Sequence, residues 1–213
     1  MSSWDLLCRR ERLAPTLKGW LVLILTACVV LILAVLGAQP FFAINEPVAG
    51  EILVVEGWVP DYTLVKALQE FRSNGYRYIV TTGEALTRGS YLQEHKSFAG
   101  LAAATLVQLG LGPDSLVAVP APRMRLNRTS SSAVAFATWL KQTHPGVKAL
   151  NVITLGVHAR RTRLLFQRSL GDTVQVGILS VEDENFDPLT WWTSSSGFQS
   201  VLEETVGYAY AFF

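Results

Sequence analysis

The sequence contains few cysteines and few charged residues. Its two cysteines are Cys8, near the N-terminus, and Cys28, inside a long apolar run. The residues after that run have no thiol, which excludes a structural disulfide, a cysteine nucleophile and a cysteine-based zinc site there. Charged residues make up 16% of the chain, against about 25% in a typical soluble protein, and the formal net charge is +1. The absence of a strongly basic or acidic tract argues against a nucleic-acid partner.

Several common catalytic and cofactor-binding motifs are also absent. The chain has no Walker loop, no GxGxxG fingerprint, no GxSxG elbow and no metal-ligand spacing among its three histidines. We therefore expect no metal site and no cofactor.

The shortage of charge is concentrated in one uncharged run, from Trp20 to Ala38. An α-helix of this length covers about the hydrocarbon thickness of a bilayer, so we interpret the run as a transmembrane anchor. A cleaved signal peptide is the alternative, because Gly37 and Ala38 are small enough to precede a cleavage site. The apolar region of a signal peptide is normally shorter, at about 7 to 15 residues.

The charges on either side of this run predict its orientation. Four basic residues precede it and two acidic residues follow it, and basic residues favour the cytoplasmic side: Arg9, Arg10, Arg12 and Lys18, then Glu46 and Glu51. We expect a single-pass protein of the cell inner membrane, with a cytoplasmic N-terminus and an exported C-terminal domain, periplasmic or equivalent. The predicted organisation is a cytoplasmic tail at 1–19, a membrane helix at 20–43, a linker at 44–50 and an α/β domain at 51–213.

Short apolar strands alternate with helical patterns throughout the predicted domain. The strands are ILVV (52–55), YIVTT (78–82), LVAVP (116–120), LNVITLG (150–156) and TVQVGIL (173–179). Such strands predict a Rossmann-like α/β fold, in which a mainly parallel sheet of about five strands has helices on both faces. Ligands of these folds bind beyond the carboxyl ends of the strands.

The strongest candidate site follows the fourth strand, where TLGVHARRTRLLFQ places His158 before three arginines. A helical projection puts Arg161 at the flank of the core-facing side, where it can lean over the strand ends. Imidazole can transfer a proton near neutral pH, and guanidinium binds phosphate in a fork, so we expect His158 and Arg161 to form a ligand site. Arg160 and Arg163 point nearly opposite, which predicts a solvated face.

Acidic residues and glycines follow the first two strands. Glu56 and Gly57 come after ILVV, where a carboxylate can face the ligand crevice and a glycine allows close approach of the backbone; a simple pairing of Glu56 with an arginine is the alternative. Gly83 and Glu84 repeat this pattern after the second strand, and an ordinary turn is their alternative. Glu94 suits the start of the next helix.

These motifs together resemble the YdcF-like domain of SanA-type and ElyC-type bacterial envelope proteins. The resemblance covers nearly all of residues 51–210, and its most specific element is a strand followed by His-x-x-Arg, here His158 and Arg161. It implies functional roles for the first-loop glycine, the glycine after the second strand, the helix-opening acid, a signature threonine and an acid of the closing helix, which correspond to Gly57, Gly83, Glu94, Thr129 and Glu204.

The sequence departs from the family pattern at four positions. Arg128 replaces an asparagine of the signature, Ser131 and Ser132 replace its Glu and Asn, and Glu56 stands where many relatives have glycine.

The resemblance implies a role in the bacterial cell envelope and in peptidoglycan or lipid-carrier metabolism. Our hypothesis is a membrane-anchored protein that binds a phosphorylated small molecule or lipid-linked intermediate and hydrolyses or transfers part of it. His158 is the expected acid or base, Arg161 the anion clamp, and Glu56 or Glu94 the orienting carboxylate. The alternative is a non-catalytic module that binds a nucleotide-like or sugar-phosphate ligand and regulates envelope biogenesis. The sequence names no protein partner.

Overall fold

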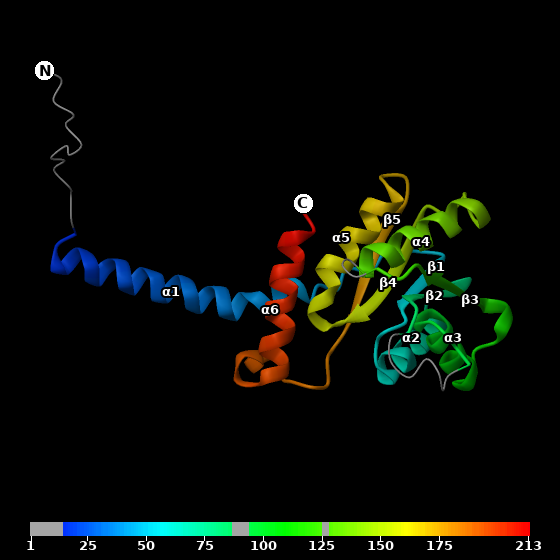
Figure 1. Ribbon diagram of the computed structural model, residues 1–213, viewed down its shortest axis with the longest axis horizontal. Helices are drawn as coiled ribbons and strands as arrows, with labels where there is room; N and C mark the ends of the chain where they lie inside the picture. Colours follow the sequence, from blue (N-terminus) through cyan, green and yellow to red (C-terminus); the bar gives the residue numbers. More distant parts are fainter. Residues whose placement is uncertain (1–14, 87–93, 125–127) are drawn as a thin grey trace, which may run out of the picture. The chain divides into compact units, whose positions relative to one another are not determined.

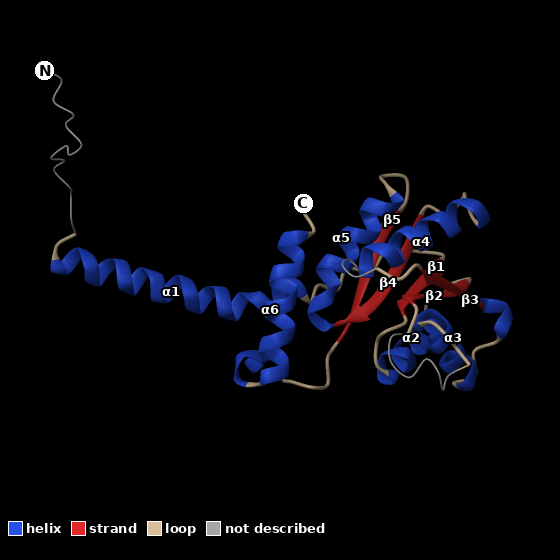
Figure 2. Cartoon of the chain, viewed as in Figure 1, coloured by secondary structure: helices blue, strands red, loops and turns tan. Residues whose placement is uncertain are grey.

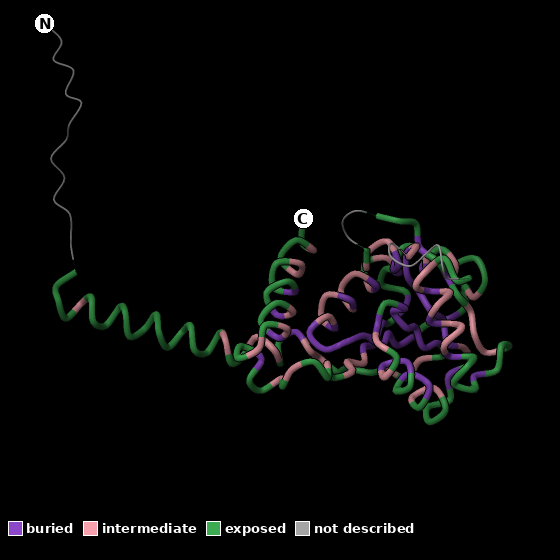
Figure 3. The backbone as a smooth tube through the Cα atoms, turned by 60° about the horizontal axis from the view of Figure 1, so that its bottom comes forward, coloured by how far each residue is buried: buried purple, intermediate pink, exposed green. Residues whose placement is uncertain are grey.

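A long apolar helix precedes the folded domain. The structure, a computed structural model, describes residues 15–86, 94–124 and 128–213, and the chain divides into two compact units after Gly37. Helix α1, Leu17–Phe42, carries no charge after Lys18 and is exposed along most of its length (Figure 3). Its length and composition are those of either a membrane anchor or a signal sequence.

The second unit is built on a sheet of five parallel strands. Its strands are β1 (Ile52–Glu56), β2 (Tyr78–Glu84), β3 (Leu116–Ala121), β4 (Ala149–Leu155) and β5 (Gln175–Val181), and their order is β3-β2-β1-β4-β5 (Figure 1). This order confirms the predicted Rossmann-like fold. β1 and β2 extend further than expected, so that Glu56, Gly83 and Glu84 belong to the strand ends and pair there with neighbouring strands.

Helices cover both faces of the sheet (Figure 2). Alternate side chains of β1 belong to two different cores, as expected for a strand buried on both sides. Ile52 and Val54 contact the core shared with α4 (Arg128–Thr143) and α5 (Ala159–Leu170). Leu53 and Val55 contact the core shared with α2 (Asp61–Ser73) and α3 (Phe98–Gln108). The remaining elements are α6 (Ser195–Tyr210) and the 3-10 turns η1 (Pro113–Ser115), η2 (Gly156–His158) and η3 (Pro188–Thr193).

The strand order places the ligand crevice of the fold at one point. From β1 the chain adds β2 and β3 on one side, and it then returns to place β4 on the other side of β1. Where strand order reverses in this way, the connections after the two central strands diverge and leave a crevice at their carboxyl ends. Glu56 ends β1, and His158 follows β4 after one 3-10 turn, so both lie at this reversal.

The segment 41–50, called the entry segment below, is bound to the domain by two arginines of α5. Arg160 donates a hydrogen bond through Nε to the carbonyl of Phe41, and the guanidinium of Arg163 forms an ion pair with Glu46. Glu46 also pairs with Ile178 of β5 in an antiparallel bridge. Arg160 and Arg163 were expected to form a solvated face. Both are partly exposed, but both also contact a segment more than a hundred positions away in the sequence.

Candidate active site

A cavity of about 760 Å³ lies at the reversal of the strand order. It is lined by residues from the ends of β1 and β2, from the loop after β1, from the starts of α3, α4 and α5, from the turn after β4 and from α6. These residues are Glu56, Trp58, Gly83, Glu84, Phe98, Arg128, Thr129, Ser132, His158, Arg161, Gly207 and Tyr210. Six of the nine residues that the sequence singles out are in this group, and the other three, Gly57, Glu94 and Glu204, are not.

His158 and Arg161 share one buried carboxylate, that of Glu204 in α6. Nδ1 of His158 lies 2.5 Å from Oε1 of Glu204, and Nε of Arg161 donates to Oε2 of Glu204 at 2.8 Å. A second hydrogen bond from Nη2 of Arg161 reaches Oε1, so the arginine holds the carboxylate in a fork. The Glu204 side chain is 1% exposed, whereas those of His158 and Arg161 are 22% and 20% exposed. The two basic side chains therefore border the cavity while their common acid lies beneath them.

This pairing keeps Glu204 ionised. Burial alone would raise the pKa of the Glu204 carboxyl, but hydrogen bonds from Arg161 and His158 outweigh it and lower the pKa to about 2. Burial alone would lower the pKa of the Arg161 guanidinium, but the hydrogen bonds to Glu204 and the charges of Glu204 and Glu56 outweigh burial and raise the pKa. An ionised Glu204 accepts a hydrogen bond from Nδ1 of His158, and Nε2 is then the ring nitrogen left for a ligand.

Glu56 contributes a second buried carboxylate to the cavity. Its Oε2 accepts hydrogen bonds from the hydroxyls of Thr154, at 2.5 Å, and Thr162, at 3.0 Å. Thr154 lies on β4 beside β1, and Thr162 lies on the core-facing side of α5, so both hydroxyls approach from the α5 side of the sheet. Two hydroxyls hold the Glu56 carboxylate directly, and its interaction with an arginine is limited to a charge attraction that helps to raise the pKa of Arg161.

Another part of the cavity lining combines an acid with the N-terminus of α4. Oε2 of Glu84 accepts a hydrogen bond from the backbone N–H of Met124 at 3.3 Å, and Oε1 lies 3.8 Å from Nε of Arg128. Arg128 and Thr129 are the first residues of this 16-residue helix, and Ser132 lies one turn further along. The unpaired N–H groups of a helix N-terminus favour an anion, and here a guanidinium and two hydroxyl-bearing side chains stand beside them.

Three glycines allow backbones to approach closely around the cavity. A Cβ on Gly57 would lie 2.5 Å from the carbonyl oxygen of Phe98, and one on Gly83, where φ is 154°, would lie 2.7 Å from Cβ of Phe98. Gly57 therefore allows the chain after β1 to pack against the start of α3. Gly57 itself does not line the cavity. A Cβ on Gly207 would lie 3.2 Å from Nε of Arg161, so this glycine lets α6 approach the arginine.

Glu94 does not open a helix, contrary to the expectation from the sequence. Helix α3 begins at Phe98, and its N-cap is Ser97, whose hydroxyl accepts a hydrogen bond from the N–H of Gly100 at 3.0 Å. Glu94 is exposed, three residues before that cap. The hydroxyl of Ser97 satisfies the N-terminal donor that the acid was expected to complement.

Among the basic residues after β3, Arg128 lines the cavity, while Arg125 lies outside the described residues.

The sequence reasoning missed five residues that line the cavity: Trp58, Phe98, Ser132, Gly207 and Tyr210. Trp58 packs edge-on against the ring of His158, with centroids 4.8 Å apart, and directly follows the glycine of the first loop. Its position just after the end of β1 could have indicated that Trp58 lines the cavity. Gly207 and Tyr210 belong to the closing helix, and nothing local in that helix indicates that it covers the strand ends.

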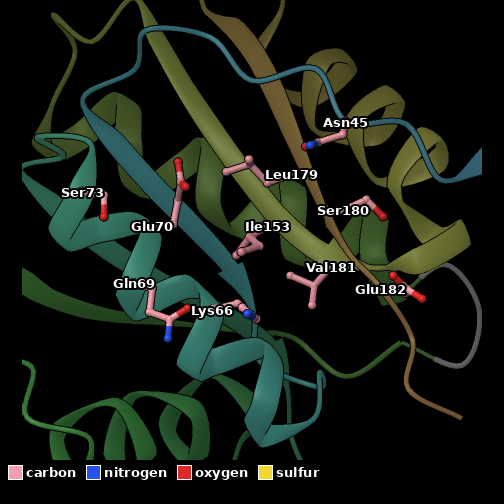
Figure 4. Close-up of a pocket in the computed structure, with 10 residues that line it drawn as sticks. All are labelled: Asn45, Lys66, Gln69, Glu70, Ser73, Ile153, Leu179, Ser180, Val181 and Glu182. Carbon is pink, nitrogen blue, oxygen red and sulfur yellow. The ribbon is translucent and has the colours of Figure 1, made fainter.

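A second hollow, of about 470 Å³, lies on the α2 side of the sheet and contains none of the predicted residues. Figure 4 shows polar side chains of α2 on one side of it and the end of β5 on the other. Within the described residues, no group of three His, Cys, Asp or Glu side chains is placed to hold a metal ion. Of these two hollows, only the first is therefore lined by candidate site residues that the sequence predicts.

Comparisons with protein-family models and with curated protein sequences give no match to this chain.

Proposed function

We propose that this protein is anchored in the cell inner membrane by α1 and that its exported domain binds a phosphorylated cell-envelope intermediate, which it hydrolyses or transfers in part. One observation carries the proposal: His158 and Arg161 share the buried carboxylate of Glu204 at the border of a cavity, where the strand order reverses. The resemblance to YdcF-like envelope proteins and the basic residues before α1 support the location.

The cavity offers several donors to a phosphate group. Nε and Nη2 of Arg161 are taken by Glu204, which leaves Nη1 for a ligand. The N-terminus of α4 supplies further donors, together with the side chains of Arg128 and Thr129. Glu56 and Glu84 favour a ligand that also carries hydroxyl groups, such as a sugar, because carboxylate oxygens accept hydrogen bonds from hydroxyls.

His158 is the proposed proton carrier. As a water or hydroxyl oxygen bonds to phosphorus, Nε2 of His158 takes its proton, and the ionised Glu204 stabilises the resulting imidazolium through Nδ1. The imidazolium then returns the proton to the leaving oxygen as the bond from phosphorus to that oxygen breaks. Glu56, held by Thr154 and Thr162, orients the attacking water or hydroxyl.

A double variant tests this proposal in cells. We expect His158→Ala combined with Arg161→Ala to abolish complementation of an envelope-stress phenotype in a strain that lacks the gene. Arg161→Lys should also fail, because lysine keeps the charge beside Glu204 but cannot hold that carboxylate in a fork and offer a further N–H to a ligand at the same time. The readout is growth under envelope stress, alongside the thermal unfolding temperature of each purified variant.

The matched control removes the same two residue types outside the cavity. His95→Ala with Arg72→Ala should complement fully, because both side chains are exposed and neither lines the cavity. Full complementation by the folded His158→Ala and Arg161→Ala variant would remove this site from the mechanism.

A further inference from the structure

Helix α6 carries an apolar stripe on its outer side. Phe198, Leu202 and Val206 are spaced four residues apart and are 52%, 51% and 50% exposed. The opposite side of the same helix is buried through Val201 and Glu204. Since side chains four residues apart lie on one face of a helix, the three form a continuous apolar strip that is about half exposed, with one side of the Phe198 ring stacked on Trp191. Exposed strips of this kind mark a surface that binds something apolar.

The end of this helix lies beside the point where the apolar helix α1 joins the domain. The ring of Tyr208 is 5.9 Å from that of Phe41 and 5.8 Å from that of Phe42, and its ring also contacts Phe212 at 5.1 Å. Phe41 and Phe42 form the last turn of α1 within the second unit. The last turn of α1 and the last turn of α6 thus share one aromatic cluster.

Two arginines of α5 lie over this aromatic cluster. The guanidinium of Arg160 is 4.1 Å from the ring centroid of Phe41, and that of Arg168 is 5.3 Å from the ring centroid of Phe212. Aromatic rings together with arginines are typical of the boundary between a bilayer and water, where rings sit at headgroup level and guanidinium groups reach the lipid phosphates.

The length of α1 places the cluster at such a boundary. About 20 helical residues cross the hydrocarbon core, so a crossing that begins near Trp20 ends near Gln39. Phe41 and Phe42 follow within one helical turn. If α1 spans the membrane, the chain itself therefore keeps the end of α6 at the membrane surface.

We infer that α6 lies along the membrane surface with Phe198, Leu202 and Val206 in the outer part of the bilayer. Gly207 and Tyr210 of the same helix line the cavity, and Tyr210 is 72% exposed. The cavity then opens at the lipid surface, so its phosphorylated ligand is lipid-linked and enters from the bilayer. This inference rests on the membrane anchor of the proposed function.

Fluorescence quenching in vesicles tests the position of α6. In the full chain with Cys8→Ser and Cys28→Ser, single cysteines at Leu202→Cys and Val206→Cys carry a nitrobenzoxadiazole label. The vesicles contain phosphatidylcholine and phosphatidylglycerol, with or without lipids spin-labelled near the headgroup. We expect about twofold or stronger quenching at both positions, because an interfacial helix buries its apolar face at this depth. No ligand is present, so the result does not depend on what the cavity binds.

Two controls separate this inference from the anchor itself. Val134→Cys in α4 is 53% exposed before substitution, nearly the same as Val206, and should remain unquenched. A chain that keeps Cys28 as its single labelled cysteine should be quenched by lipids spin-labelled deep in the acyl chain. Quenching at Cys28 with none at the two α6 positions would overturn the inference and leave the anchor intact. Absence of quenching at Cys28 would overturn both.

Discussion

Replacing Glu204 with glutamine is expected to lower the free energy of unfolding by about 3–5 kcal/mol, because it leaves the largely buried guanidinium of Arg161 without its carboxylate. Glutamine has nearly the same shape, so the loss reports charge and hydrogen bonding rather than a cavity. Urea unfolding of the full chain in detergent micelles, followed by tryptophan fluorescence, measures it.

The neighbouring Glu203→Gln is the matched control for this substitution. Glu203 is exposed and accepts a hydrogen bond only from Gln199, at 2.8 Å, among the described residues. Its replacement should change stability by less than about 0.5 kcal/mol, as is usual for an exposed side chain. Equal losses in the two variants would show that Glu204 does not hold the site together.

The same carboxyl predicts how stability depends on pH. Its pKa is about 2 in the folded chain against an ordinary value of 4.5, so the ionised form favours folding. This contribution, on the order of 3 kcal/mol, is complete above about pH 5 and is lost as the pH falls towards 2. Glu204→Gln should lack that portion of the acid dependence. An unchanged acid profile in the variant would contradict the assignment.

Replacing Asn151 with leucine is expected to lower the free energy of unfolding by about 2–4 kcal/mol, since it removes the partner of three polar groups at once. Asn151 is fully buried on β4. Its Oδ1 accepts from the N–H of Val48 at 2.8 Å, and its Nδ2 donates to the carbonyl of Val48 at 2.7 Å and to the hydroxyl of Tyr76 at 2.8 Å. Asn151 therefore fixes the entry segment to the sheet.

Two residues beside Asn151, Gly177 and Tyr76, show how tightly its side chain is packed and hydrogen-bonded. A Cβ on Gly177 of β5 would lie 2.0 Å from Oδ1 of Asn151, so only glycine leaves room for the amide. Burial, together with the hydrogen-bonded Glu70 carboxylate, raises the pKa of Tyr76 to about 12, so its hydroxyl keeps the proton that it donates to Glu70.

Asn74→Leu is the control, because Asn74 is exposed and makes one long hydrogen bond. Similar urea midpoints for the Asn151 and Asn74 variants would contradict this role.

The fold was predictable because its signals are local. Runs such as ILVV and LNVITL have no polar side chain on either face except near their ends, and this requires strands covered on both sides. His158 and Arg161 were predictable for a similar reason: they follow a strand end directly, and three positions along a helix bring two side chains to one side.

The remaining parts of the site depend on contacts that no spacing encodes. Glu204 lies 46 positions after His158, and only the family resemblance indicated it. Tyr210 reaches the cavity because α6 packs against η2 and α5, a tertiary contact that the pattern of α6 does not specify. Arg160 and Arg163 were expected in solvent, because both point away from the core in a helical projection. The projection of α5 cannot show that the entry segment contacts this side of the helix.

Ligand binding at the cavity of His158 and Arg161 is tested most directly by untargeted mass spectrometry of the small molecules and lipids that co-purify with the full chain. We predict a phosphorus-containing, lipid-linked compound in amounts close to one per chain with the wild-type protein, and its loss from the His158→Ala and Arg161→Ala variant. A wild-type protein that carries no more phosphorus-containing compound than the folded variant would contradict a phosphate-binding site in this cavity.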